Sequence, residues 1–309
     1  MSPPGRPMGE FRSAQHEGTP VSEPAMSAAA MSDRSETPQR PNGGQAFATE
    51  IVRIGTQALR VGRQPGNGGV PLLMFNGIGG NIELLAPIAR RMPEREVITF
   101  DVPGVGHSAV PSRPYRLRGI ARLAAAVLDH FGHAQADVLG VSWGGAAAQQ
   151  FARSFGSRCR RLVLCATAPG VVMLPARPSV LLKMATPRRY MSSDYARSVS
   201  GEIYGGDFRS NPELAAEFFK HVRWQSRLGY YLQLGAAWGW TSIHWLHRLR
   251  QPTLIMAGRD DPLVPLANAK LMRLLIPHSE LQVFDCGHLF LMTRGEASAR
   301  AIGEFLDRP

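Results

Sequence analysis

Eight short runs of apolar residues alternate with longer stretches of mixed polarity from Glu50 to the end of the chain. The later runs are continuously apolar, without the alternation of a strand that has one face in water. Such runs are typical of a parallel sheet covered by helices on both faces. The runs are IVRI, ALRVG, PLLMFN, EVITFD, ADVLGVS, RRLVLCAT, PTLIMAG and LQVFDCG. The pattern predicts an α/β fold with a mostly parallel central sheet.

The first 45 residues have a different composition. They are rich in Pro, Ser, Gly and charged residues and nearly devoid of large apolar ones. Such a segment cannot bury enough apolar surface to offset the entropy lost on ordering. We therefore expect residues 1–45 to be a disordered N-terminal extension.

The chain has 309 residues and a formal net charge of +11, which would suit a polyanionic partner. Only Lys183, Lys220 and Lys270 are lysines, however, and the arginines are spread along the chain without one dense basic run. We expect no nucleic-acid partner. A diffuse positive surface would still suit docking on an anionic, phospholipid-coated surface.

Three sequence features bear on the compartment. No apolar run reaches 18 residues, and no basic segment followed by an apolar one opens the chain. The three cysteines are odd in number and lack the paired spacing of metal ligands. The sequence therefore predicts a cytoplasmic protein without a transmembrane segment, and it does not predict an oligomeric state.

The spacing of the glycines argues against a nucleotide-binding site. The third apolar run is followed by NGIGGNIE, in which Gly77 and Gly79 match the first two glycines of a dinucleotide fingerprint, but Ile82 stands at the third position. The G-x-x-x-x-G-K-[ST] motif of phosphate-binding loops is also missing from the sequence. We expect no nucleotide cofactor.

The sequence GVSWG, residues 140–144, places Ser142 between an apolar run and a helical stretch. This is the context of the G-x-S-x-G nucleophile elbow, a sharp turn from strand to helix that exposes a serine hydroxyl. The glycines on either side let neighbouring segments approach a strained backbone closely. A chance match in a glycine-rich chain is the alternative, and the strand before and helix after argue against it.

A serine nucleophile needs a base and an acid that orients the base. His288 follows the last apolar run, and Asp260 and Asp261 follow the run before it. Ser, Asp, His is the chain order of G-x-S-x-G hydrolases, and side chains at the carboxyl ends of parallel strands converge. Backbone N–H groups of Trp143 and of the loop FNGIGGN are expected to form the oxyanion hole.

The other histidines do not complete a metal site. His130 and His133, and His244 and His247, have three-residue spacing that could place two imidazoles on one helix face. No carboxylate or cysteine completes either set, so we expect no metal.

Several stretches resemble the intracellular medium-chain-length polyhydroxyalkanoate (PHA) depolymerases of storage-granule bacteria, which belong to the α/β-hydrolase superfamily. The resemblance covers residues 50–309. Its stretches in the cap are the more specific ones, because the elbow and DVPGVGHS occur across many unrelated hydrolases. The stretches are LLMFNGIGGNIELLAPI, FDVPGVGHS, GVSWGGAAAQQFA, ATAPGVVMLP, PRRYM, IYGGDFR, LGYYLQL, GWTSIHWLH and GHLFLMTR.

The resemblance implies roles for individual residues. Asp261 rather than Asp260 is the acid, since it has the family's spacing from Gly258 and Pro265. Ile78 occupies the place of the second oxyanion donor, and Asn76, expected to contact substrate, stands where many relatives have His. Asp101 starts a structural turn.

The resemblance also implies a domain organisation. Residues 46–167 and 252–309 would form the hydrolase core, and residues 168–251 a helical cap inserted between strands 6 and 7. The cap segment holds four of the five tryptophans and five of the six tyrosines. Such rings suit a groove for an aliphatic polyester, and we expect Trp238 and Trp240 to bind substrate, although packing the cap onto the sheet would use the same rings.

The implied activity is hydrolysis of the ester bonds of stored poly(3-hydroxyalkanoate) to 3-hydroxy acids, without a cofactor and at the granule surface. Related polymer synthases have Cys in the elbow, so Ser142 favours hydrolysis over synthesis. A small-ester carboxylesterase, a carbon–carbon bond hydrolase and a cofactor-free haloperoxidase need the same three residues and remain alternatives. A granule-coating protein with a vestigial triad is a further alternative, which the intact triad argues against.

Overall fold

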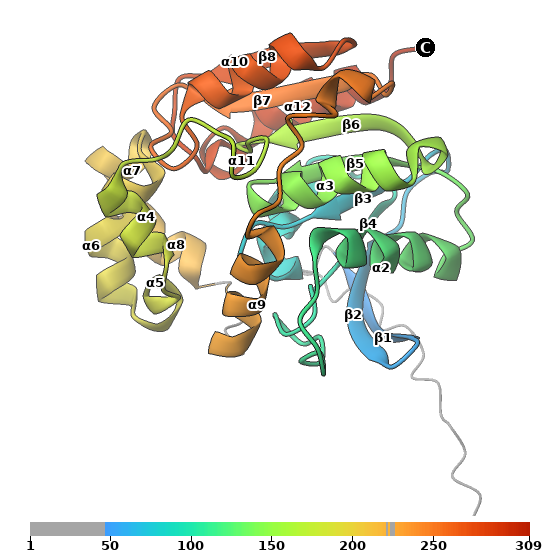
Figure 1. Cartoon of the computed structure of the whole chain (residues 1–309), viewed down its shortest axis with the longest axis horizontal. Coiled ribbons are helices and arrows are strands. Elements are labelled where there is room, and N and C mark those ends of the chain that lie inside the picture. Colours follow the sequence, from blue (N-terminus) through green and yellow to red (C-terminus); the bar gives the residue numbers. More distant parts are fainter. Residues whose placement is uncertain (1–46, 221, 223–225) are drawn as a thin grey trace, which may run out of the picture. The chain divides into compact units, whose positions relative to one another are not determined.

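A computed structural model of the chain describes residues 47–220, 222 and 226–309 (Figure 1). The disorder predicted for residues 1–45 lies outside these described residues. No helix among the described residues has the length and apolar character needed to cross a bilayer.

The centre of the described chain is one sheet of eight strands in the order β1-β2-β4-β3-β5-β6-β7-β8. The pairs β1–β2 and β2–β4 are antiparallel, and all other neighbours are parallel. Each of the eight predicted runs forms one strand, so the predicted fold is confirmed. The strands are β1 Ala48–Ile54, β2 Gln57–Gln64, β3 Leu72–Phe75, β4 Val97–Phe100, β5 Ala136–Val141, β6 Cys159–Cys165, β7 Thr253–Gly258 and β8 Ser279–Phe284.

Helices cover both faces of the sheet, which explains the continuously apolar runs. In β3, Leu73 and Phe75 belong to the apolar core on one face, whereas Leu72 and Met74 belong to the core on the other. The first core is completed by α2 Leu117–His130, α3 Trp143–Ser154 and α10 Leu266–Leu275. The second is completed by η1 Ile82–Leu85, α1 Ala86–Ala89, α11 Phe290–Thr293 and α12 Gly295–Leu306.

The segment between β6 and β7 is mostly helical, and Figure 1 shows its helices α4 to α8 beyond the carboxyl ends of these strands. The helices α6 to α8 share a small apolar cluster that includes Ile203, Tyr204 and Phe208. Helix α9 instead packs Tyr230 and Ala236 into the first of the two cores, the one that contains Leu73 and Phe75. The elements of the segment are α4 Pro178–Met184, α5 Arg188–Met191, α6 Ser193–Tyr204, α7 Asp207–Ser210, α8 Glu213–Phe219, α9 Arg227–Ala237 and η3 Leu246–Arg248. The domain boundaries themselves stay a prediction.

Candidate active site

Ser142 lies on the sharp turn between β5 and α3. Its backbone has φ 54° and ψ −116°, a left-handed conformation that is uncommon outside glycine. The N–H of Ser142 donates to Cys165 O (2.8 Å), and its carbonyl accepts from Gly145 N (2.9 Å) and Thr167 Oγ1 (2.8 Å). These hydrogen bonds hold the strained turn in place.

The glycines beside Ser142 are required by close contact, as expected from the motif. A Cβ on Gly140 would lie 2.2 Å from the carbonyl oxygen of Gly144. A Cβ on Gly144 would lie 2.3 Å from the carbonyl oxygen of Phe75, at the end of β3. Any larger residue at either position would push α3 away from the sheet.

His288 and Asp261 come from the loops that follow β8 and β7. The imidazole Nδ1 of His288 lies 2.7 Å from Oδ2 of Asp261, and both side chains are almost fully buried. The other carboxylate oxygen accepts the backbone N–H groups of Leu263 (2.9 Å) and Val264 (2.8 Å). Because a carboxylate oxygen is an acceptor, this contact assigns the hydrogen to Nδ1 and leaves Nε2 as the ring nitrogen with a free lone pair.

Asp260, the other candidate acid, is half exposed and pairs with α7 instead. Its carboxylate accepts from Arg209 Nε (2.7 Å) and Gly206 N (2.8 Å). The hydrogen bond from Arg209 lowers the pKa of Asp260. The structure therefore brings Asp261, and not Asp260, to His288.

Asp101, which follows β4, is fully buried, and its carboxylate accepts hydrogen bonds from two backbone N–H groups. It accepts the N–H groups of Ile82 (2.8 Å) and His107 (2.9 Å), and Arg60 lies 3.4 Å away. Burial raises the pKa of Asp101, and these partners oppose the rise. Its contacts fit the structural turn that the resemblance implies.

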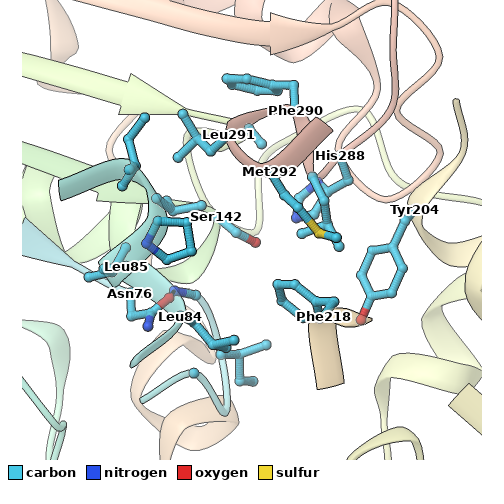
Figure 2. A pocket seen from close by; sticks show the side chains of 18 of the residues that line it. Asn76, Leu84, Leu85, Ser142, Tyr204, Phe218, His288, Phe290, Leu291 and Met292 are labelled. Carbon is cyan, nitrogen blue, oxygen red and sulfur yellow. Dashed lines mark hydrogen bonds between the residues drawn. The ribbon is translucent and has the colours of Figure 1, made fainter. Parts of the chain in front are cut away.

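Ser142 and His288 line one cavity of about 270 Å³. Figure 2 shows the Ser142 hydroxyl pointing into this cavity, with His288 across from it. The remaining wall is mainly apolar, with Leu84 and Leu85 on the core side and Phe218 on the side of the inserted helices. The Ser142 hydroxyl thus faces a small, largely apolar chamber.

The loop after β3 offers a backbone N–H group, that of Ile78, without an acceptor in the described residues. Gly77 N donates to the side chain of Asn76 (2.8 Å), Gly79 N to Gln233 Oε1 (2.7 Å) and Gly80 N to Gly77 O (3.0 Å). Within the described residues, the backbone N–H of Ile78 meets no acceptor. This N–H is therefore available to a bound oxyanion.

Trp143 supplies the second available donor at the start of α3. A helix leaves its first N–H groups without intrahelical acceptors, and no other acceptor for Trp143 N is found in the described part of the chain. The amide of Asn76 also lines the cavity, but its Nδ2 donates to Asn81 O (2.6 Å) within its own loop.

Two residues of the inserted segment hold the expected oxyanion loop, residues 75–81, and the sequence analysis missed both. Tyr190 donates its hydroxyl hydrogen to the carbonyl of Ile78. Gln233 of α9 accepts from Gly79 N, and its backbone carbonyl accepts the Trp143 indole N–H (2.8 Å). Gln233 and Gly79 are 154 positions apart, so no local motif could signal the contact.

The expectation that Trp238 and Trp240 line the substrate groove is not supported. Neither ring contributes to the wall of the cavity. Trp238 ends α9 with 80% of its surface exposed. Trp240 donates its indole N–H to Gln150 of α3 (2.9 Å) and packs edge-on against Trp245, so it attaches the segment to the core.

The histidines of the first pair, His130 and His133, make contacts outside the cavity. His130 lies 3.5 Å from Glu50, and His133 lies 3.1 Å from Glu96. In the described residues, no group of three or more His, Cys, Asp or Glu side chains is arranged to hold a metal ion.

Comparison with known proteins agrees with this fold. The sequence profile of the α/β hydrolase fold matches residues 70–295. The chain belongs to the α/β-hydrolase family. It is 50% identical over 266 residues to the poly(3-hydroxyalkanoate) depolymerase of Ectopseudomonas oleovorans, which covers 85% of this chain and 94% of that protein. The resemblance to PHA depolymerases is therefore confirmed.

More distant α/β-hydrolases share the architecture. A 2-hydroxymuconate semialdehyde hydrolase of a Pseudomonas species is 28% identical over 86% of this chain and 96% of its own length. The crystal structure of a hydrolase from Pseudomonas aeruginosa superposes with a TM-score of 0.72, at 23% identity over 86% of this chain and all of that one. These relatives support the fold.

Proposed function

We propose that the chain hydrolyses the ester bonds of poly(3-hydroxyalkanoate), with Ser142, His288 and Asp261 as its catalytic triad. One observation carries the assignment of residues: the Ser142 hydroxyl and the imidazole of His288 line one cavity, and Asp261 lies 2.7 Å behind that imidazole. The substrate class rests on the 50% identity to the depolymerase of Ectopseudomonas oleovorans.

The reaction is an acyl transfer in two steps. His288 takes the proton of Ser142 as the serine oxygen attacks an ester carbonyl, and the N–H groups of Ile78 and Trp143 stabilise the oxyanion. His288 then returns the proton to the departing alkoxide. Water, activated by the same imidazole, hydrolyses the acyl-serine and restores Ser142, while Asp261 stabilises the imidazolium in both steps.

The apolar wall of the cavity favours polymers with longer side chains. Leu84, Leu85 and Phe218 offer contact to alkyl groups. Each additional buried methylene contributes about 0.8 kcal/mol, which is about fourfold in binding. We therefore assign the enzyme to medium-chain-length polymers.

We further infer a cytoplasmic enzyme that docks on polymer granules. Among the described residues, nine of the twelve exposed large hydrophobic side chains belong to the inserted segment. Apolar surface gathered on one segment is a common mark of an interaction site. The nine are Val171, Val172, Leu174, Leu181, Leu182, Met191, Leu228, Tyr231 and Trp238.

The test is an assay of purified protein on amorphous granules of poly(3-hydroxyoctanoate) and of poly(3-hydroxybutyrate), with released acids identified by mass spectrometry. We expect release of 3-hydroxyoctanoate at the higher rate, and none from Ser142→Ala with an unchanged melting temperature. Equal or faster release from the short-chain polymer would contradict the chain-length assignment. Activity confined to small esters would reject the polymer and leave a carboxylesterase.

A further inference from the structure

Arg189 is a buried cation in the wall of the catalytic cavity. It lies on α5 and is 1% exposed. Within the described residues, no carboxylate lies within ion-pair distance of its guanidinium, and its Nε has no hydrogen-bond partner. The undescribed positions of the inserted segment, 221 and 223–225, are His, Arg, Trp and Gln, so that gap contains no acidic residue.

The partners that Arg189 does have are neutral. One terminal nitrogen donates to the Tyr230 hydroxyl (2.9 Å) and to Thr186 O (3.3 Å), and the other donates to the Tyr190 hydroxyl (3.4 Å). The guanidinium also lies 4.4 Å from the ring centroid of Tyr190 and 5.3 Å from that of Tyr230. Aromatic faces and phenols offset part of the cost of burying a cation, but they do not neutralise it.

Tyr204 adds a second polar group beside Arg189. Burial raises the pKa of its phenol, and the charge of Arg189 opposes that rise. In the described part of the chain, the Tyr204 hydroxyl has no acceptor, whereas Tyr190 and Tyr230 donate to Ile78 O and Met184 O.

Tyr204 also connects this pair of residues to the reaction centre. Its ring stacks on the imidazole of His288 with centroids 6.3 Å apart, and its backbone carbonyl accepts His288 N (2.7 Å). Figure 2 shows Tyr204 at the edge of the cavity next to His288. A buried cation and a phenol hydroxyl without an acceptor in the described residues thus line the same cavity as Ser142 and His288.

We propose that Arg189 and Tyr204 form a carboxylate-binding subsite within the catalytic cavity. A planar guanidinium with an unused N–H matches a carboxylate in shape and charge, and hydrogen bonds between ions are about twice as strong as neutral ones. Resting on the proposed function, the ligand is the free carboxylate at the end of a 3-hydroxyalkanoate chain. The enzyme therefore cleaves the ester nearest that end.

That cleavage follows the two steps of the proposed acyl transfer. Ser142 attacks the terminal ester carbonyl, the remaining chain becomes the acyl group on the serine, and the leaving alkoxide is the terminal 3-hydroxy acid. His288 protonates this alkoxide, and Arg189 holds its carboxylate until it departs. Water then releases the shortened chain with a new free carboxylate.

The first experiment uses the wild-type enzyme, so it does not depend on how a variant folds. Octanoate, octanamide and 1-octanol compete against p-nitrophenyl butyrate, a neutral reporter that any serine esterase of this kind cleaves. We expect the inhibition constant of octanoate to be about tenfold or more below that of octanamide, because only octanoate carries the charge. Equal constants for octanoate and octanamide would overturn the subsite.

Variants test whether the preference for octanoate depends on Arg189 and Tyr204. The ratio of the inhibition constant of octanamide to that of octanoate should fall nearly to one in Arg189→Gln. It should fall less far in Tyr204→Phe, and Arg189→Lys should retain part of the wild-type ratio. Arg188→Gln is the matched control, since it removes the same charge from the neighbouring exposed residue, whose guanidinium lies over Tyr195. A ratio that falls equally in Arg188→Gln would reject the subsite.

A substrate pair separates the subsite from the polymer assignment. The dimer of 3-hydroxyoctanoate is offered as the free acid and as its methyl ester, and we expect the free acid to have a KM about tenfold lower in wild type but not in Arg189→Gln. If both dimers are cleaved with equal KM, the function stands and the subsite falls. If neither is cleaved but octanoate discrimination depends on Arg189, the subsite stands and the polymer assignment falls.

Discussion

Asp260 and Asp261 are neighbours in the sequence, but their carboxylates have opposite surroundings. Asp261 is buried, bonds to His288 and accepts two backbone N–H groups, whereas Asp260 is half exposed and pairs with Arg209. Only Asp261 can therefore hold the imidazole of His288 in one tautomer. A surface ion pair such as Asp260–Arg209 contributes about 0–1 kcal/mol to stability.

This contrast gives the first prediction. Asp261→Asn should lower kcat/KM for p-nitrophenyl octanoate by about 10³-fold or more, because a neutral amide cannot stabilise the positive charge that develops on His288. Asp260→Asn, the matched control, should stay within about threefold of wild type, with a small loss of melting temperature. The reverse order of the two variants would show that the wrong aspartate was assigned.

Residues defined by local sequence were the ones that sequence reasoning could find. The motif GVSWG can be recognised from its own residues, because neighbouring backbone atoms lie too close to Gly140 and Gly144 for a side chain at either position. Asp261 and His288 follow apolar strands in a known order. Trp238 and Trp240 were judged from residue type alone, and type does not say which way a ring points.

Among the elements, α5 and α9 carry the contacts at the site that could not be predicted from the sequence. The eight strands follow from hydrophobic patterning, and the helical insertion was implied by the family resemblance. The hydrogen bonds of Tyr190 and Gln233 to the oxyanion loop depend instead on how the inserted helices dock. Patterning within one element carries no information about such docking.

Gln233 should act as a positioning residue for the oxyanion loop. Gln233→Leu leaves Gly79 N without its acceptor, so we expect kcat for p-nitrophenyl octanoate to fall about tenfold or more while KM changes little. Gln233→Glu retains an acceptor oxygen, and the Nε2 that it removes has no partner among the described residues. It should therefore recover part of the lost kcat.

The control for Gln233 is a second hydrogen bond between core and insertion. Gln150 of α3 accepts the Trp240 indole N–H at 2.9 Å, far in sequence from the oxyanion loop. Gln150→Leu should lower the melting temperature about as much as Gln233→Leu does, but its kcat should stay near that of wild type. Equal losses of kcat in Gln150→Leu and Gln233→Leu would show that both act through the stability of the insertion alone.

Over the described part of the molecule, exposed apolar side chains gather on the inserted segment, while the cavity lined by Ser142 and His288 lies beneath it. Trp238 is 80% exposed and carries the largest of these side chains. Leu274 on α10 is equally exposed, at 81%, but belongs to the hydrolase core. If the inserted segment faces the granule, these two residues should differ in their contribution to docking.

Trp238→Ser should weaken binding to poly(3-hydroxyoctanoate) granules by about tenfold, because burying roughly 60 Å² of apolar ring surface contributes about 1.5 kcal/mol. Hydrolysis of soluble p-nitrophenyl octanoate should be unchanged, since Trp238 lies outside the cavity wall. Leu274→Ser should leave both properties near wild type. Co-sedimentation at several protein concentrations measures the affinity. Weakening of equal size in Trp238→Ser and Leu274→Ser would mean that docking has no preferred face, since any exposed apolar side chain would then serve.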